Sequence, residues 1–307
     1  MKARKMRART ELFFAAVLFG LMAVLARQGS QGTEAFTAPQ ITFVRFVVGT
    51  GMTLALFRLR PGTFRPVNRR LLFTRGLLGG LAVLLYFLAL SRIPAGEATL
   101  LNNTFPVIAV LLSFYTLGER PTFHLALALA IVTAGMFMVL GDGYQTTGLG
   151  WGHLAGLASA FLGAGAVTSI RALRATDNAP TIFFAFCVGG AVVAAPFAMH
   201  SWPAGSSLWA LAVAVGVLSF GAQILMTDAY GALTVAEAAL WQQLTPVASY
   251  VWALAVLGER FGPLEAAGVL VGIAGVTYGT VLGHKAAGAK EATAATAIDA
   301  TEPVKPA

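Results

Sequence analysis

The sequence predicts an all-α integral membrane protein of ten transmembrane helices, arranged as two inverted five-helix repeats. Three observations support this fold class: an apolar composition, ten apolar runs of membrane-spanning character, and a similarity between the two halves of the chain. Hydrophobic residues make up 57% of the 307 residues and charged residues only 11%, whereas soluble globular proteins have about 25% charged residues. Water is therefore not the main solvent of this chain.

The apolar runs define the predicted spans. A helix crosses the hydrocarbon core with about 20 apolar residues, because a backbone in lipid must satisfy its own hydrogen bonds. The ten runs are Leu12–Ala26, Pro39–Phe57, Leu71–Leu90, Ala95–Leu117, Pro121–Leu140, Gly148–Ile170, Pro180–Met199, Leu208–Ala229, Ala236–Leu257 and Pro263–Leu282. They divide the chain into a basic N-terminus (1–11), a first repeat (12–142), a second repeat (143–284) and a tail (285–307) whose composition predicts disorder.

The basic residues predict the orientation of the spans. The formal net charge of +8 comes from short clusters between apolar runs, a pattern that indicates membrane topology and not a nucleic-acid-binding surface. Loops rich in Lys and Arg stay in the cytoplasm. With the N-terminus inside, the outer loops hold only Arg27, Arg92 and Arg260. We therefore expect a multi-pass protein of the plasma (inner) membrane, embedded in the lipid bilayer, with both termini in the cytoplasm.

A segment of the first half aligns with a segment of the second half at a constant offset of 140 residues without a gap. Ala95–Arg120 and Val235–Arg260 share nine identical positions, and the same offset pairs Phe46 with Phe186. Because each half contains an odd number of spans, the second half must enter the membrane from the opposite side. Inverted repeats of this kind place a binding site near the midplane, where the halves meet, and expose it to each face in turn.

These features resemble the drug/metabolite transporter superfamily, and specifically its EamA-type ten-helix members. The resemblance rests on two spans that end in Leu-Gly-Glu-Arg, at 117–120 and 257–260, each with a proline eleven residues before its leucine. It covers the chain from Leu12 to Gly283. The resemblance implies cytoplasmic termini, a central cavity lined mainly by the first four spans of each half, and transport of amino acids or other metabolites.

Each of the two similar spans offers a group of polar side chains near the membrane centre. Proline frees the backbone carbonyl four residues earlier and kinks its helix. Side-chain amides donate and accept hydrogen bonds without a buried charge, which suits a polar substrate that must also be released. They could instead bond across helices and hold the bundle together. The candidate groups are Pro106 with Asn102 and Asn103 in the first half, and Pro246 with Gln242 and Gln243 in the second.

Further candidates come from spans whose equivalents line the cavity in the resemblance. Tyr86, Gln223 and Trp241 lie in such spans, and Trp241 is the preferred aromatic contact because it is next to Gln242. Tyr230 lies near a span end, where tyrosine is usually an interfacial anchor. Such aromatic side chains could stack on a planar or apolar part of a substrate.

Two arginines lie inside predicted spans. Arg45 is about seven residues into the second span, deeper than a charge normally lies without a function. It could meet a substrate carboxylate, or it could extend to the outer headgroups or pair with Glu34. Arg75 is close enough to the cytoplasmic side to be an ordinary anchor.

A membrane enzyme would need a nucleophile, metal ligands or paired acids that converge on one site. The sequence contains neither His-Glu-x-x-His nor Gly-x-Ser-x-Gly, and its single cysteine, Cys187, lies within an apolar run. We therefore expect no enzymatic activity, no cofactor and no metal site.

Transport is the function that the sequence favours once an enzyme is excluded. The sequence predicts a transporter of small polar or amphipathic metabolites, first of all an amino-acid or related metabolite exporter, that works by alternating access as a monomer or homodimer. An importer of metabolites or vitamins with the same fold, or a receptor or scaffold without transport, are the alternatives. No Asp or Glu lies at the centre of a predicted span. We therefore expect a facilitator or an exchanger and not a proton-driven transporter.

Overall fold

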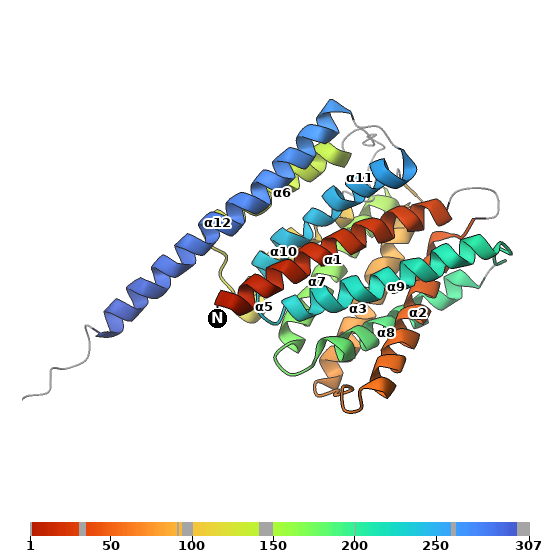
Figure 1. The fold of residues 1–307 in the computed structure, drawn as a ribbon, viewed down its shortest axis with the longest axis horizontal. Coiled ribbons are helices and arrows are strands. Elements are labelled where there is room, and N and C mark those ends of the chain that lie inside the picture. Colours follow the sequence, from red (N-terminus) through yellow and green to blue (C-terminus); the bar gives the residue numbers. More distant parts are fainter. Residues whose placement is uncertain are drawn as a thin grey trace, which may run out of the picture.

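The computed structural model of this chain describes residues 2–30, 35–90, 92–93, 101–140, 150–199, 201–258 and 262–299. The regular secondary structure in these ranges is helical throughout. Figure 1 shows one bundle of helices, from which the far end of the last helix projects. The helices are α1 (Lys2–Gly29), α2 (Ala38–Leu59), α3 (Arg69–Leu90), α5 (Phe105–Leu117), α6 (Phe123–Leu140), α7 (Trp151–Leu173), α8 (Ala179–Ala198), α9 (Ser206–Ala229), α10 (Val235–Gln242), α11 (Leu244–Leu257) and α12 (Pro263–Asp299).

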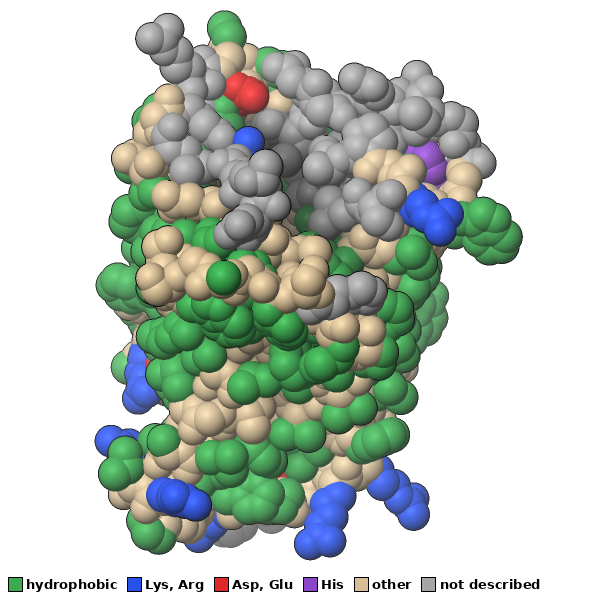
Figure 2. Space-filling model, turned by 90° about the vertical axis from the view of Figure 1, so that its right-hand side faces the viewer, with side chains coloured by type: hydrophobic (Ala, Val, Ile, Leu, Met, Phe, Trp, Pro, Cys, Tyr) green, Lys and Arg blue, Asp and Glu red, His purple; other side chains and the backbone are tan. Residues whose placement is uncertain are grey.

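The outer surface of the bundle is apolar. Seven described helices are long and apolar enough to cross a membrane, and Phe105–Leu117 and Phe123–Met138 are shorter apolar helices. Large side chains such as Phe73 and Val192 are 73% and 69% exposed. Figure 2 shows hydrophobic side chains over much of one face, with several Lys and Arg side chains near its lower edge. Apolar surface of this extent is unfavourable in water, but it matches the hydrocarbon of a bilayer.

The helices pack in pairs that the sequence repeat exchanges. An offset of 140 residues relates α1 to α7, α2 to α8, α3 to α9 and α6 to α12. In the structure α1 packs along α9 while α3 packs along α7, and α2 packs on α9 while α3 packs on α8. The pairs α2–α8 and α6–α12 join repeat equivalents directly. This exchange is what an approximate twofold axis between two inverted halves produces.

Glycines allow the closest helix crossings. A Cβ atom at Gly76 of α3 would lie 2.7 Å from the carbonyl oxygen of Ala185 in α8. A Cβ atom at Gly135 of α6 would lie 2.8 Å from the carbonyl oxygen of Gly268 in α12. Neither crossing leaves room for a side chain, so backbone packs directly on backbone, as is common between helices in membranes.

The two Leu-Gly-Glu-Arg corners end their helices through glycine. Gly118 follows α5 with φ 68°, and Gly258 follows α11 with φ 67°. Both residues are in the left-handed conformation, which glycine adopts without steric cost and which commonly ends a helix. The repeat therefore preserves a backbone turn in both halves. Glu259 and Arg260 lie outside the described residues.

The terminal helices include residues on both sides of the predicted spans. Helix α1 begins at Lys2, within the basic segment 1–11. Helix α12 continues to Asp299, within the segment 285–307. Both segments are rich in alanine together with lysine, arginine or glutamate. These residues have high helix propensity, so a preceding or following helix extends through them readily.

Candidate functional site

A cavity of about 310 Å³ lies inside the bundle, between the two halves of the chain. Helices α1, α2, α3, α7, α8 and α9 contribute to its wall, as do the segments around residues 102–106 and 242–245. Its apolar lining includes Phe19, Met22, Phe105, Phe186 and Met226. Its polar lining consists of Arg45, Arg75, Tyr86, Asn102, Asn103, Gln223, Gln242, Gln243 and Thr245.

The amide pairs lie where their helices are interrupted. Helical structure at residues 101–102 gives way to a turn at 103–104 before α5 begins, and one residue, Gln243, separates the end of α10 from the start of α11. Pro106 is in the first turn of α5 and Pro246 is in the first turn of α11, where proline needs no hydrogen-bonded N–H. Each proline therefore lies in the first turn of the second helical segment, just after the interruption. Discontinuous helices that meet at the repeat interface are typical of transporter binding sites.

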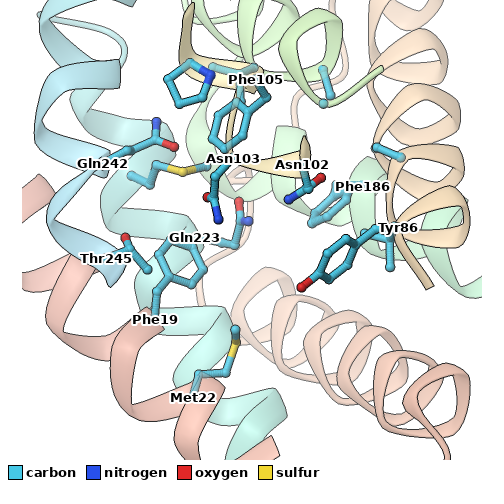
Figure 3. Close-up of a pocket in the computed structure, with 18 of the residues that line it drawn as sticks. Phe19, Met22, Tyr86, Asn102, Asn103, Phe105, Phe186, Gln223, Gln242 and Thr245 are labelled. Atoms are coloured by element: carbon cyan, nitrogen blue, oxygen red, sulfur yellow. The ribbon is translucent and has the colours of Figure 1, made fainter. Parts of the chain in front are cut away.

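The structure holds two of the amides by specific hydrogen bonds. The Ser159 hydroxyl of α7 donates to Asn102 Oδ1 at 3.0 Å. The Gln242 amide donates to the hydroxyl of Tyr230, a side chain that is fully buried. Both bonds leave the other end of the amide available to the cavity. Figure 3 shows Asn103, Gln223 and Gln242 directed toward the same space, with Tyr86 across it.

The cavity gathers seven of the eight predicted substrate-binding residues, and Trp241 is the one it does not include. Trp241 packs instead against the apolar cluster of Ala128, Val132, Leu240 and Val276. Adjacent residues lie about 100° apart on a helix, so the side chain next to Gln242 faces the neighbouring helices. Tyr230 is also placed differently from the prediction, because it is buried inside the bundle and is not an interfacial anchor.

Arg75 is a cavity residue that the sequence analysis treated as an ordinary anchor. It is 4% exposed and its guanidinium carbon lies 4.0 Å from the centre of the Phe186 ring. Arg45 lies in the same cavity, with its guanidinium carbon 5.2 Å from the centre of the Phe46 ring. Two features of the sequence could have indicated that Arg75 lies in the cavity: Arg45 and Arg75 are both arginines within predicted spans, and the repeat pairs Phe46, next to Arg45, with Phe186. The sequence does not show which way the side chains of α3 face.

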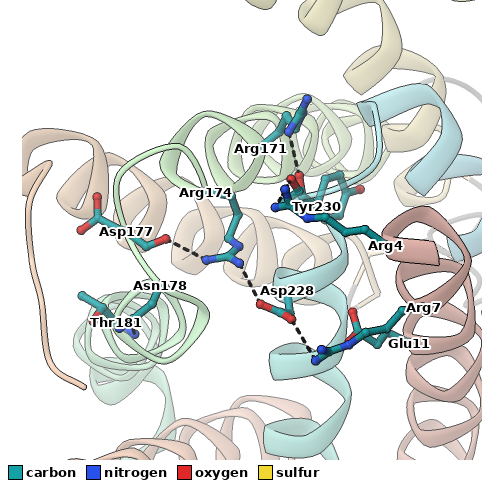
Figure 4. Close-up of polar contacts among 11 residues, drawn as sticks. Arg4, Arg7, Glu11, Arg171, Arg174, Asp177, Asn178, Thr181, Asp228 and Tyr230 are labelled. Carbon is teal, nitrogen blue, oxygen red and sulfur yellow. Dashed lines mark hydrogen bonds and ion pairs between the residues drawn. The ribbon is translucent and has the colours of Figure 1, made fainter. Parts of the chain in front are cut away.

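A network of charged side chains joins several helix ends at the N-terminal end of α1 (Figure 4). Arg174, just after α7, donates to Asp228 Oδ1 at 2.7 Å and to the carbonyl oxygen of Asp177 at 2.9 Å. Arg171 donates to Glu119 Oε1 at 2.7 Å, and Glu119 Oε2 accepts from the backbone N–H of Val235 at 2.7 Å. These bonds connect the ends of α7, α8 and α9, the α5–α6 corner and the start of α10.

A further ion pair joins α1 to the second half at this end. Arg9 donates to Glu237 Oε1 at 2.8 Å, and both side chains are largely buried. In the ranges that the structure describes, no group of three or more His, Cys, Asp or Glu is arranged to hold a metal ion. The ionic groups of this region therefore act on one another and on helix ends.

Comparison with known proteins agrees with the repeat. The EamA-like transporter family matches residues 11–141 and again residues 150–279. The pseudopaline exporter CntI of Pseudomonas aeruginosa strain PAO1 is 29% identical over 218 residues, which are 70% of this chain and 75% of that protein. The counterpart in strain UCBPP-PA14 has the same identity and coverage.

A solved structure shares the fold. It is a crystal structure with a TM-score of 0.78 and 22% sequence identity, covering 90% of this chain and 98% of the other. The double family match confirms the predicted all-α fold of ten helices in two repeats, and makes the chain a transport protein and not an enzyme. The chain therefore belongs to the EamA-like transporter family, as a multi-pass membrane protein built from two inverted five-helix repeats.

Proposed function

We propose that this protein exports a small polar metabolite across the inner membrane by alternating access about the cavity between its two halves. The observation that carries the proposal is the cavity at the repeat interface, which has both polar and apolar side chains and is bordered by both interrupted helices. Its volume of about 310 Å³ suits a metabolite of modest size. Export as the direction is supported by the relative from Pseudomonas aeruginosa, whose name describes an exporter. Amino acids and related compounds are the first substrates to test.

The charged network provides the closure at one end of this cycle. Because the basic clusters favour a cytoplasmic N-terminus, the network at the start of α1 lies on the cytoplasmic side. Helix ends joined by Arg171–Glu119 and Arg174–Asp228 must separate when the cavity opens to the cytoplasm to load substrate. The rest of each helix can then move as a rigid unit, which is how inverted repeats exchange access.

Flux through the purified protein in proteoliposomes tests this function. With amino acids and related metabolites supplied inside or outside the vesicles, we expect at least one to move faster than through protein-free vesicles. Asn102→Ala and Gln242→Ala should each reduce that flux by about tenfold, because each removes a hydrogen-bonding group from the cavity. Gln28→Ala is the matched control, since Gln28 is exposed and lies outside the cavity lining.

Three results would each contradict a part of this proposal. Absence of flux for every compound, in protein whose fold is intact, would favour a receptor or scaffold. Normal flux in both amide variants would show that Asn102 and Gln242 do not bind the substrate and serve helix packing. A net preference for inward movement would favour an importer.

We also propose that the substrate gradient drives transport, by facilitated diffusion or exchange. None of the described residues that line the cavity is Asp, Glu or His, and proton-driven transporters use such groups to carry the proton. Flux of a zwitterionic substrate should therefore be insensitive to an imposed pH gradient at zero membrane potential. The measurement is uptake with valinomycin and equal potassium on both sides, and acceleration by the pH gradient would overturn this assignment.

A further inference from the structure

Among the residues that the structure describes, the cavity contains two positive charges and no acidic side chain; Glu34, which the sequence offered as a partner of Arg45, lies outside the described residues. Arg45 of α2 and Arg75 of α3 both line it, and Arg75 is 4% exposed. Neither guanidinium has an ion-pair partner in the part of the chain that the structure describes. None of the described lining residues is acidic. A buried charge normally has a partner of opposite sign, because its removal from water is costly.

The two arginines are held near each other by a pair of aromatic rings. The guanidinium of Arg45 lies against Phe46, and that of Arg75 lies over Phe186. The two rings meet edge to face with their centres 5.0 Å apart. Phe46 and Phe186 are repeat equivalents, so this contact lies on the approximate twofold axis between the halves. Ring faces orient a guanidinium and weakly attract it, but they do not neutralise its charge.

Further polar atoms in the same wall lack partners. Arg45 Nε, Arg75 Nε, Gln223 Oε1 and Gln243 Nε2 are buried without a hydrogen-bond partner among the described residues. All four side chains line the cavity, and Gln223 and Gln243 are 8% and 3% exposed. Buried polar groups are almost always hydrogen-bonded. This concentration of unpaired donors and acceptors therefore marks a surface that is completed by a ligand.

We propose that Arg45 and Arg75 form an anion-binding subsite and that the transported substrate is a small organic anion. Its carboxylate or phosphate oxygens meet the two guanidiniums, and the amides of the interrupted helices bind its other polar groups. Guanidinium suits this task because its planar donors match an oxyanion in pairs. The proposal rests on the transport function given above and names the substrate class of the same cavity.

A purely structural role for the arginines predicts the opposite effect on stability. If the contacts with Phe46 and Phe186 served only to join α2, α3 and α8, replacing either arginine would lower the melting temperature. If the two arginines bind an anion, replacing one of them by glutamine removes an unpaired buried charge from the ligand-free protein. That protein should then melt at the same or a higher temperature. The ligand-free melting temperature therefore separates the two roles.

Thermal unfolding of the purified full-length protein with defined anions is the experiment. The probes are glutarate, citrate, L-glutamate and glycerol 3-phosphate, with glutaramide and glycerol as uncharged counterparts. We expect at least one anion, and neither uncharged compound, to raise the melting temperature. Arg45→Gln and Arg75→Gln should weaken apparent affinity for that anion roughly 10- to 100-fold. Comparing carboxylates with the phosphate ester identifies the oxyanion.

Two more variants sharpen the experiment. Gly79→Ala keeps both arginines, but its methyl group would collide with the guanidinium of Arg75 and with the Phe186 ring. It should also weaken anion binding. Arg58→Gln, which removes an exposed arginine from the same helix as Arg45, should leave it unchanged.

The inference is overturned if no anion stabilises the wild-type protein, or if Arg45→Gln and Arg75→Gln respond to anions as the wild type does. A lower ligand-free melting temperature in both variants, with anion binding retained, would assign the arginines to helix packing. Transport of only uncharged or cationic compounds would refute the anion subsite and leave the transport function intact. Anion binding that depends on both arginines, without flux of any compound, would support the anion subsite and refute the transport function.

Discussion

Alanine in place of Gly189 is expected to lower the melting temperature markedly, with a loss of about 1–3 kcal/mol in the free energy of unfolding. A Cβ atom at this position would lie 2.7 Å from the Cα and carbonyl carbon of Gly76. Both atoms belong to the backbone of α3, so no side-chain rotation can relieve the overlap. The helices α3 and α8 must then separate, and the stack of Arg75 on Phe186 separates with them.

Alanine variants of two other glycines provide controls for the loss of stability expected of Gly189→Ala. A Cβ atom at Gly49, the repeat equivalent of Gly189, would meet Cys187 Sγ at 2.8 Å and the Phe183 ring at 3.1 Å. These are side-chain atoms and can move, so Gly49→Ala should cost less than Gly189→Ala. Gly51 is exposed on the same helix and has nothing within 4 Å of a Cβ atom. Thermal unfolding in one detergent should rank Gly51→Ala as the most stable variant and Gly189→Ala as the least stable. Equal stability of the three variants would contradict the close contact between α3 and α8 at Gly189.

Replacing Glu119 with alanine is expected to cost about 2 kcal/mol of folding free energy and to weaken the closure at the α1 end. The change leaves the Arg171 guanidinium without its carboxylate and the N–H of Val235 without its acceptor. The Glu119 side chain is 15% exposed and that of Arg171 is 31% exposed, so water compensates only in part. If these bonds close the cavity at this end, as proposed above, the variant should also favour the conformation that is open there.

The size of this effect can be measured by chemical or thermal unfolding of Glu119→Ala, Glu119→Gln and Arg171→Gln. Glutamine keeps an oxygen for Val235 but loses the charge, so Glu119→Gln should be the milder of the two changes at that position. A double-mutant cycle of Glu119 with Arg171 isolates their coupling. Arg7→Gln is the control, because the Arg7 side chain is 76% exposed and ion pairs of exposed side chains contribute little. Equal losses for Glu119→Ala and Arg7→Gln would contradict this assignment.

The two interrupted helices show which features of the candidate site could be predicted from the sequence. The prolines and amides in register predicted two polar groups near the midplane, and the structure places Asn102, Asn103, Gln242 and Gln243 in one cavity. That prediction needed only the repeat and the loss of a backbone donor at proline. The structure interrupts each helix just before its proline, at residues 103–104 and at residue 243.

The chain by itself determined the fold class, the ten spans, the inverted repeat and the polar groups that the repeat duplicates. These properties follow from composition, length and self-similarity, which do not depend on how the helices are turned. Only the tertiary structure decided that Arg75 and Tyr230 are buried inside the bundle and that Trp241 packs away from the cavity. In water the apolar side of a helix indicates its buried face. In a bilayer lipid and protein interior are both apolar, so the facing of each side chain is set by close packing between helices.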